Sequence, residues 1–221
     1  AARRGEVAVT IDDGPDPEVT PAVLDQLRKH GAHATFFCIA ERARRHPQLV
    51  QRIVAEGHSV QNHSLRHRHH FSLLGPAGFA RELSAAQEVL GGLTGAYPRF
   101  FRAPAGLRNP FLQPVLARQH LLLTSWTRRG YDTRERDPGR VLDRLCRGLA
   151  AGDILLLHDG HAARAADDRA VVLHVLPALL QRMQRLSLRS VTLDQALQPA
   201  PGACAVSAHA RSGPSNSYSA P

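Results

Sequence analysis

The sequence predicts an α/β fold in which a parallel sheet is covered by helices. Short apolar runs alternate with helical patterns about seven times along the chain, which is typical of strands joined by helical crossovers. With 221 residues, the chain is long enough for one domain with a full-sized core. Its hydrophobic share of 43% and charged share of 21% are ordinary for a globular protein.

Seven apolar runs are expected to form the strands. The first of them ends in Asp12 and Asp13, directly before Gly14-Pro15, as expected where a strand gives way to a turn. The expected strands are residues 7–12, 34–38, 59–62, 100–104, 121–126, 153–158 and 190–193.

Helical patterns fill the segments between these strands. Thr20-Pro21 has the composition of an N-cap followed by proline at the first helical position, and this helix is expected to end at Lys29-His30-Gly31. The other expected helices are residues 47–56, 79–91, 109–119, 137–151 and 171–186.

The composition changes near the C-terminal end. From Pro199 the chain is rich in Ala, Ser, Gly and Pro, so we expect one domain over residues 1–198 and a flexible tail over 199–221. The three cysteines, Cys38, Cys146 and Cys204, are too few and too widely spaced for a disulfide framework or a zinc ribbon. We expect each to be a plain buried or tail thiol.

The net charge of +9 comes from arginine, since Lys29 is the only lysine. Arginine-rich chains bind nucleic acid, anionic lipid or acidic glycan, because guanidinium pairs well with phosphate and carboxylate. A nucleic-acid-binding protein is therefore one alternative. The arginines are scattered over every predicted helix without a basic-aromatic module, so solvated faces and no specific nucleic-acid partner are expected.

No segment of the sequence is typical of a membrane span or a secretion signal. The longest apolar runs fall short of the roughly 18 residues that a spanning helix needs. The first four residues, Ala-Ala-Arg-Arg, do not resemble a signal peptide, so we expect any targeting segment to lie outside this chain.

The residues with catalytic or ligating chemistry follow the predicted strands. In a parallel barrel the C-terminal ends of the strands form one rim, where active sites lie. We therefore expect a single site made from residues at the ends of strands one, three, four, five and six: Asp12 and Asp13, His63 and His67, Arg102, Asp132, and His158.

The adjacent carboxylates of Asp12 and Asp13 favour a bound cation. Two acids held this close repel each other, and a cation removes that cost. His63 and His67 are four residues apart, so on a helical turn both imidazoles point the same way. Two histidines and one carboxylate form a metal site that leaves positions open for water and substrate. His69 and His70, in the same histidine-rich stretch, are expected to be surface residues.

Other residues of the rim suggest general acid–base chemistry. Arg102 is either a surface ion-pair partner or a group that orients a carboxylate. His158 is either a core histidine or a general acid, and Asp132 either raises its pKa or is a simple loop acid. The backbone N–H of Ala105 could point at a developing oxyanion.

Together these pieces resemble the polysaccharide deacetylases of the NodB-homology type, carbohydrate esterase family 4. The resemblance covers residues 6–197 and rests on motifs in the family's order: Thr10–Pro15 with Ile11 in place of Phe, His63–His67, Arg102-Ala-Pro104, and Leu156-Leu-His158. It implies a distorted (β/α)7 barrel, similar to a TIM barrel, in a single domain.

The resemblance also implies a role for each site residue. Asp12 would be the general base, oriented by Arg102, and His158 the general acid, tuned by Asp132. Asp13, His63 and His67 would bind one divalent metal ion, Zn²⁺ in the first place, with Co²⁺, Ni²⁺ or Mn²⁺ as alternatives. The N–H of Ala105 would stabilise the oxyanion, and Trp126 and Leu156 would line the pocket for the acetyl methyl group.

The fourth motif departs from the family pattern Asp-x-x-Asp-Trp. Here Asp132 keeps the position of the second aspartate, but Arg129 replaces the first and Thr133 replaces the tryptophan. The loss of an aromatic wall leaves the identity of the substrate open. Arginines at 42, 44, 45 and 129 weakly favour an anionic glycan.

The resemblance predicts a metal-dependent hydrolase that removes N-acetyl groups from an amino-sugar polymer or oligomer and releases acetate. The same machinery could act on O-acetyl esters, a lipid-linked sugar or a cyclic amide. A glycan-binding domain without turnover is the non-enzymatic alternative. The substrate class suggests the cell envelope or another extracytoplasmic location, and the sequence leaves the oligomeric state unknown.

Overall fold

A computed structural model describes residues 5–198 of the protein. The predicted tail at 199–221 and Cys204 lie outside the described residues. Cys38 is buried and Cys146 is half-buried, and both are free thiols, as expected. No helix in the described range is both long and apolar enough to cross a membrane.

Eight short strands form one sheet, and helices connect them. The strands are Glu6–Asp12 (β1), Thr35–Cys38 (β2), Ser59–Asn62 (β3), Phe100–Phe101 (β4), Leu122–Leu123 (β5), Arg128–Arg129 (β6), Ile154–His158 (β7) and Arg189–Val191 (β8). The α-helices are Thr20–Lys29 (α1), Ala40–Arg45 (α2), Pro47–Ala55 (α3), Pro76–Thr94 (α4), Leu112–Arg118 (α5), Pro138–Cys146 (α6), Val172–Arg185 (α7) and Leu193–Leu197 (α8). Two 3₁₀ turns lie at Phe71–Leu73 (η2) and Pro104–Gly106 (η3).

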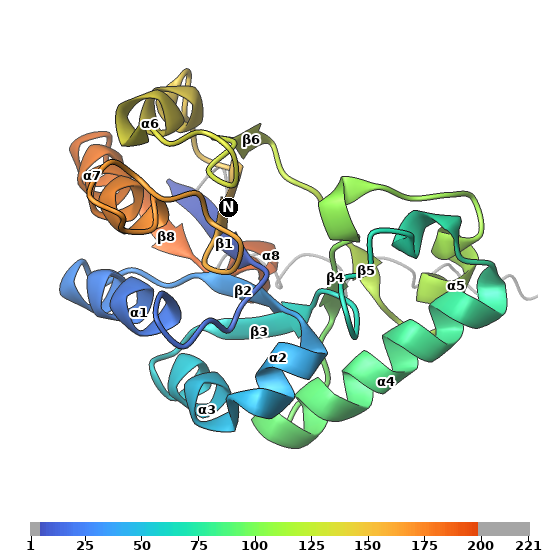
Figure 1. Ribbon diagram of the computed structural model, residues 1–221. Helices are drawn as coiled ribbons and strands as arrows, with labels where there is room; N and C mark the ends of the chain where they lie inside the picture. The colour runs from blue at the N-terminus through green and yellow to red at the C-terminus, as the bar shows by residue number, and fades with distance from the viewer. Residues whose placement is uncertain (1–4, 199–221) are drawn as a thin grey trace, which may run out of the picture.

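The sheet is parallel and curled, with helices on its outer face (Figure 1). Seven strands form one path in the order β5-β4-β3-β2-β1-β7-β6, in which β1 lies between β2 and β7. The eighth strand, β8, pairs with the first residues of β1, whereas β2 pairs with its last residues. This confirms the predicted α/β class and the distorted barrel of a single domain.

Alternation along β1 and β7 decides which side chains face the inside of the barrel. Val7, Val9 and Ile11 belong to the main apolar core, together with Leu155 and Leu157. Because successive side chains of a strand point to opposite faces, the residues between them point inward. Those residues are Ala8, Thr10 and Asp12 on β1, and Leu156 and His158 on β7.

Some predicted elements differ from the structure. β6, α2 and α8 were not predicted, β5 is shorter than the expected 121–126, and β4 ends before Arg102. The last strand was expected to reach Leu193 but ends at Val191, and Leu193 begins α8. The helix expected at 137–151 ends at Cys146, before Gly148, which has a positive φ of 66°.

The prediction that Thr20 caps α1 is wrong. Thr20 is the first residue of the helix, and the preceding Val19 makes no side-chain cap. The hydroxyl of Thr20 instead accepts from the N–H of Asp16 and donates to Asp159. It therefore ties the start of α1 to the loop after β7.

Candidate active site

The pairing of β1 with β7 places Asp12 opposite His158, since these two residues are register partners. Asp12 is 2% exposed, and its Oδ1 accepts a 2.7 Å hydrogen bond from Nη1 of Arg102. The same nitrogen of Arg102 donates to Thr10 on the same inward face of β1. Asp12 is therefore held in a fixed direction by a buried ion pair.

Arg102 is itself enclosed on several sides. Its Nη2 donates to the carbonyl of Ser125 at 3.0 Å, and its guanidinium lies 4.1 Å from the centre of the Phe37 ring. Burial lowers the pKa of Arg102, although the charge of Asp12 raises it. Between the two readings of the sequence, the structure favours the buried partner of Asp12 over a surface ion pair.

Asp13, His63 and His67 form a cluster of potential metal ligands. Oδ1 of Asp13 lies 3.1 Å from Nε2 of His63 and 3.3 Å from Nε2 of His67. One ligand atom from each of the three residues lies within 4.8 Å of the others. Burial raises the pKa of Asp13, but the neighbouring imidazoles of His161 and His63 bring the net pKa well below its ordinary value.

The state of these donor atoms fits a divalent cation. Oδ1 of Asp13 is buried and has no hydrogen-bond partner, which is costly for a carboxylate oxygen. Nδ1 of His63 lies 2.8 Å from the carbonyl oxygen of Arg102, which can only accept, so Nδ1 carries a proton and Nε2 is the nitrogen that faces Asp13. Burial lowers the pKa of His63, but Asp12 and Asp13 together raise it above its ordinary value. Burial and the neighbouring His63 lower the pKa of His67 to about 4, so the imidazole of His67 is neutral at pH 7.

His158 is paired with a buried acid. Its Nδ1 lies 2.9 Å from Oδ1 of Asp132, and its backbone N–H donates to Oδ2 of the same carboxylate at 2.7 Å. Burial by itself lowers the pKa of His158, but the charge and hydrogen bond of Asp132, together with the charges of Asp12 and Asp13, outweigh burial and raise the pKa to about 9. The imidazole is therefore protonated at neutral pH, as a proton donor must be.

The three predicted pocket residues lie around this cluster. Ala105 is in η3, with a left-handed φ of 53°. Trp126 packs against the next residue, since a Cβ on Gly106 would lie 2.7 Å from its ring. Leu156 is buried one inward position below His158 on β7. These placements leave the oxyanion and pocket roles as predictions.

In the fourth motif, the guanidinium of Arg129 lies close to two aromatic rings. The guanidinium of Arg129 lies 5.3 Å from the ring centre of Trp126 and 4.2 Å from that of Tyr131. Arg129 thus covers the indole, where the family pattern has an aspartate. Thr133 is half-buried, and His69 and His70 are exposed, as expected.

Sequence reasoning missed His161. It lies in the loop after β7, three residues beyond His158, and its Nδ1 is 3.1 Å from Oδ2 of Asp13. The rule that a parallel barrel gathers its chemistry where strands end could have found it, because it follows β7 directly. Asp159, also missed, is fully buried, and burial raises its pKa to about 7.

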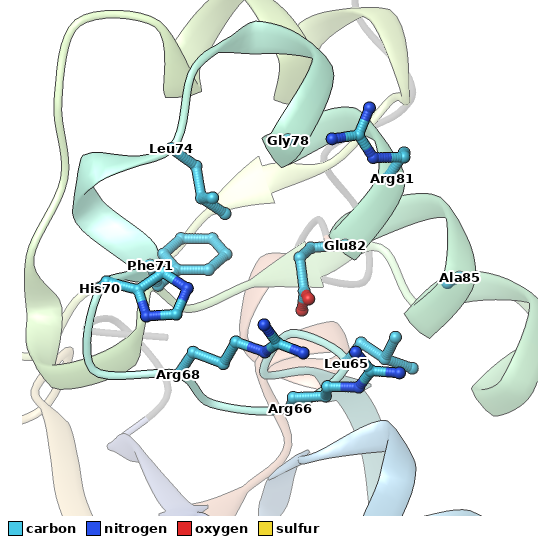
Figure 2. Close-up of a pocket in the computed structure, with 10 residues that line it drawn as sticks. All are labelled: Leu65, Arg66, Arg68, His70, Phe71, Leu74, Gly78, Arg81, Glu82 and Ala85. Atoms are coloured by element: carbon cyan, nitrogen blue, oxygen red, sulfur yellow. The ribbon is translucent and has the colours of Figure 1, made fainter.

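A pocket of about 370 Å³ lies between the loop that carries His67 and helix α4 (Figure 2). Three arginines line it, Arg66, Arg68 and Arg81, and Figure 2 shows the carboxylate of Glu82 pointing toward the first two. None of the predicted site residues lines this pocket. This pocket is therefore separate from the cluster at the rim.

Comparisons with known proteins identify the family of this chain. The family model described as polysaccharide deacetylase matches residues 1–121. A peptidoglycan-N-acetylglucosamine deacetylase of Bacillus cereus is 32% identical over 199 residues, which cover 87% of this chain and 88% of that protein. A chitooligosaccharide deacetylase of Bradyrhizobium sp. is 33% identical, with 86% of this chain and 89% of that protein covered.

Solved structures give the same result. A family 4 carbohydrate esterase from Streptomyces lividans, in complex with acetate, is 32% identical, with a TM-score of 0.76 over 84% of this chain and 91% of that one. A family 4 pseudoenzyme from Bacillus anthracis, 20% identical with a TM-score of 0.79 over 90% of this chain and 67% of that one, shares the fold alone. A common fold does not by itself imply turnover, so the activity must be argued from the site. On these matches, the chain belongs to the polysaccharide deacetylase family, the NodB-homology group of carbohydrate esterase family 4.

Proposed function

We propose that this carbohydrate deacetylase removes N-acetyl groups from an amino-sugar polymer or oligomer and releases acetate. The proposal rests on the juxtaposition of Asp12 and His158, which lie opposite each other but have different partners. Asp12 is fixed by a buried arginine, and His158, its register partner, is held protonated by Asp132. A base and an acid on one rim match what amide hydrolysis requires.

Asp12 is proposed as the general base. Its Oδ1 is occupied by Arg102, whereas Oδ2 lies 3.8 Å from Nε2 of His63, on the side of the candidate ligands. A water between Asp12 and the acyl carbon would give its proton to Oδ2 as it attacks. Arg102 balances the charge of the carboxylate and fixes its orientation throughout.

Asp13, His63 and His67 are proposed to hold one divalent metal ion. Zn²⁺ is the first candidate because two imidazoles and one carboxylate are common zinc ligands, and Co²⁺, Ni²⁺ or Mn²⁺ would also suit the set. When bound, such a cation supplies Lewis-acid chemistry, polarising a carbonyl oxygen and making water more acidic. The carbonyl of Arg102 keeps Nε2 of His63 available for it.

His158 is proposed as the general acid. Attack by water on the carbonyl carbon forms a C–O bond and a tetrahedral oxyanion. When this intermediate collapses the C–N bond breaks, and the leaving nitrogen needs a proton to depart as an amine. His158 can deliver that proton, because Asp132 keeps its imidazole charged at neutral pH. We propose that the N–H of Ala105 donates to the oxyanion and that Trp126 and Leu156 surround the acetyl methyl group.

The names of the relatives direct the choice of substrate. Peptidoglycan and chitooligosaccharides are the substrates in those names, so N-acetylglucosamine units in such glycans are proposed here. We therefore also propose an extracytoplasmic location at the cell envelope, where such glycans lie. Acetyl esters, lipid-linked sugars and cyclic amides are the alternative substrates.

The proposal is tested by acetate release from N-acetylglucosamine oligomers and from peptidoglycan, after metal has been stripped and zinc or cobalt re-added. We expect metal-dependent release that falls at least 100-fold in Asp12→Asn. Asp168→Asn makes the same substitution as a control at a position outside the site, where the side chain is 87% exposed. Full activity of Asp12→Asn would refute the assigned base, and turnover of esters alone would move the substrate away from amides.

A further inference from the structure

His161 contacts Asp13, a candidate metal ligand, through the carboxylate oxygen that does not face His63 and His67. Oδ1 of Asp13 faces His63 and His67, and its other oxygen, Oδ2, lies 3.1 Å from Nδ1 of His161. The imidazole of His161 is 54% exposed, and its ring centre is 6.0 Å from that of His67. Asp13 therefore has two imidazoles near Oδ1, those of His63 and His67, and one near Oδ2, that of His161.

Arg42 of α2 determines which nitrogen of His161 carries the proton. Its Nη2 lies 2.8 Å from Nε2 of His161, and its Nη1 donates to the backbone carbonyl of Asp13 at 2.9 Å. A guanidinium has only donors, so Nε2 of His161 must accept. The proton then lies on Nδ1, where it is donated to Oδ2 of Asp13.

Gly160 lets the backbone pass close to Arg42 and Asp13 at this contact. A Cβ added to Gly160 would lie 2.3 Å from Nη1 of Arg42 and 2.5 Å from the carbonyl oxygen of Asp13. Asp13 and His161 both have left-handed backbones, with φ of 75° and 59°. Such conformations cost about 1–3 kcal/mol each and persist only where the surroundings enforce them.

We propose that His161 is a positioning residue for the metal site, with its tautomer set by Arg42. By donating to Oδ2 it turns Oδ1 of Asp13 toward His63 and His67 and leaves Oδ1 as the one free oxygen of that carboxylate. The proposal rests on the proposed metal site and adds two residues, from α2 and from the loop after β7, that determine how well it binds. Groups that hold a ligating carboxylate typically change metal affinity 10–100-fold when they are removed.

The test is the affinity of the purified chain for Zn²⁺ and Co²⁺, measured by competition with a chromogenic chelator. His161→Leu should bind each ion about 10–100-fold more weakly than the unmodified chain. His161→Asn should stay within about 3-fold, because its amide N–H can replace the donor at Nδ1. The visible spectrum of the Co²⁺ form should change in His161→Leu and stay unchanged in His161→Asn.

A second contact in the chain supplies the control. His174 lies 3.1 Å from Asp167, the same separation as His161 from Asp13, but outside the site. His174→Leu should bind metal as the unmodified chain does. Equal affinities of His161→Leu and His174→Leu would overturn the proposal.

Two further variants separate the possible failures. If Asp13→Asn binds metal normally, the proposed metal site itself is wrong. If Asp13→Asn loses metal while His161→Leu does not, only the role of His161 is wrong. Should His161→Leu not fold, Arg42→Met makes the same test, since it frees the tautomer, and it should weaken binding several-fold.

Discussion

At the scale of single residues, backbone strain is concentrated at the site. Nine non-glycine residues of the described range have a positive φ, a conformation that costs such residues free energy. Six of the nine belong to the loops that carry the candidate chemistry: Asp13, Ser64, His67, Ala105, Tyr131 and His161. The surrounding fold must therefore hold these loops in place.

Arg102 offers the sharpest residue-scale test of that support. It is 1% exposed, and its removal leaves the charge of Asp12 buried without a partner. We expect Arg102→Met to abolish deacetylation and to lower the free energy of unfolding by about 3–5 kcal/mol, measured by urea denaturation. Arg118→Met, at an exposed position of α5, is the control. A loss below about 1 kcal/mol would show that the pair is not needed for stability.

The pH dependence of catalysis should follow His158. Its pKa is raised to about 9, mainly by Asp132 acting against burial, so the acid form is lost as pH rises through that value. Asp132→Asn removes the charge that raises the pKa. The alkaline limb of the kcat profile should therefore move to lower pH, while the limb in Asp167→Asn should stay in place. An unmoved limb in Asp132→Asn would mean that another group supplies the proton.

At the scale of elements, the sequence predicts those that have an apolar pattern and misses those that have none. α4 and α7 bury a periodic apolar face, and both appear where expected. β6 consists of two arginines, so no alternation could indicate it, and only its pairing with β7 defines it. α2 has six residues and is fixed by hydrogen bonds to the carbonyls of Ser64 and Leu65.

Gly130 tests how β6 is held against α6. A Cβ at this position would lie 2.5 Å from Cγ1 and 3.0 Å from the backbone oxygen of Val141. We expect Gly130→Ala to destabilise the protein by about 1–3 kcal/mol and to lower activity, because Asp132 lies two residues further on. Gly92→Ala, in open space on α4, should instead stabilise by up to about 1 kcal/mol. Thermal melts of both variants would compare them, and equal shifts would contradict this packing.

At the scale of the whole molecule, the site joins six separated parts of the chain (residues 12–13, 42, 63–67, 102–105, 126–132 and 156–161), and the sequence predicted most but not all of them. Residues at strand ends could be predicted, because parallel strands bring their C-terminal ends to one rim. Arg42 could not, since it reaches the site from the middle of a helix. The tautomers of His63 and His161 also depend on partners 39 and 119 residues away, which no local pattern reveals.

Asp159 should make the stability of the whole domain depend on pH. It joins α1 to the loop after β7 through Thr20, and burial raises its pKa to about 7. Because the folded pKa lies above the ordinary value of 3.8, its contribution is fully present below about pH 4 and is lost as pH rises through 7. In the presence of a chelator, Asp159→Asn should gain stability relative to the unmodified chain between pH 5 and 8.

Urea unfolding at pH 5 and at pH 8 measures this gain. The substitution removes the contribution of Asp159 to the pH dependence of the free energy of unfolding, which for one group is at most about 1.4 kcal/mol per pH unit. Asp168→Asn, on an exposed turn, should show no such gain. A constant difference between Asp159→Asn and the unmodified chain would place the pH dependence elsewhere.

β1 pairs with β7 and β8, which are synthesised long after it, and this affects folding during synthesis on the ribosome. Thr10 bonds to a carbonyl 145 residues later, and Glu6 pairs with Arg189, 183 residues later. At about 5–20 residues per second, roughly 7 to 30 seconds pass before β7 follows β1 out of the ribosome. Contacts this distant in sequence also slow folding once the chain is complete. A nascent chain that stops before β8 would contain every candidate catalytic side chain and still lack the last strand that flanks β1.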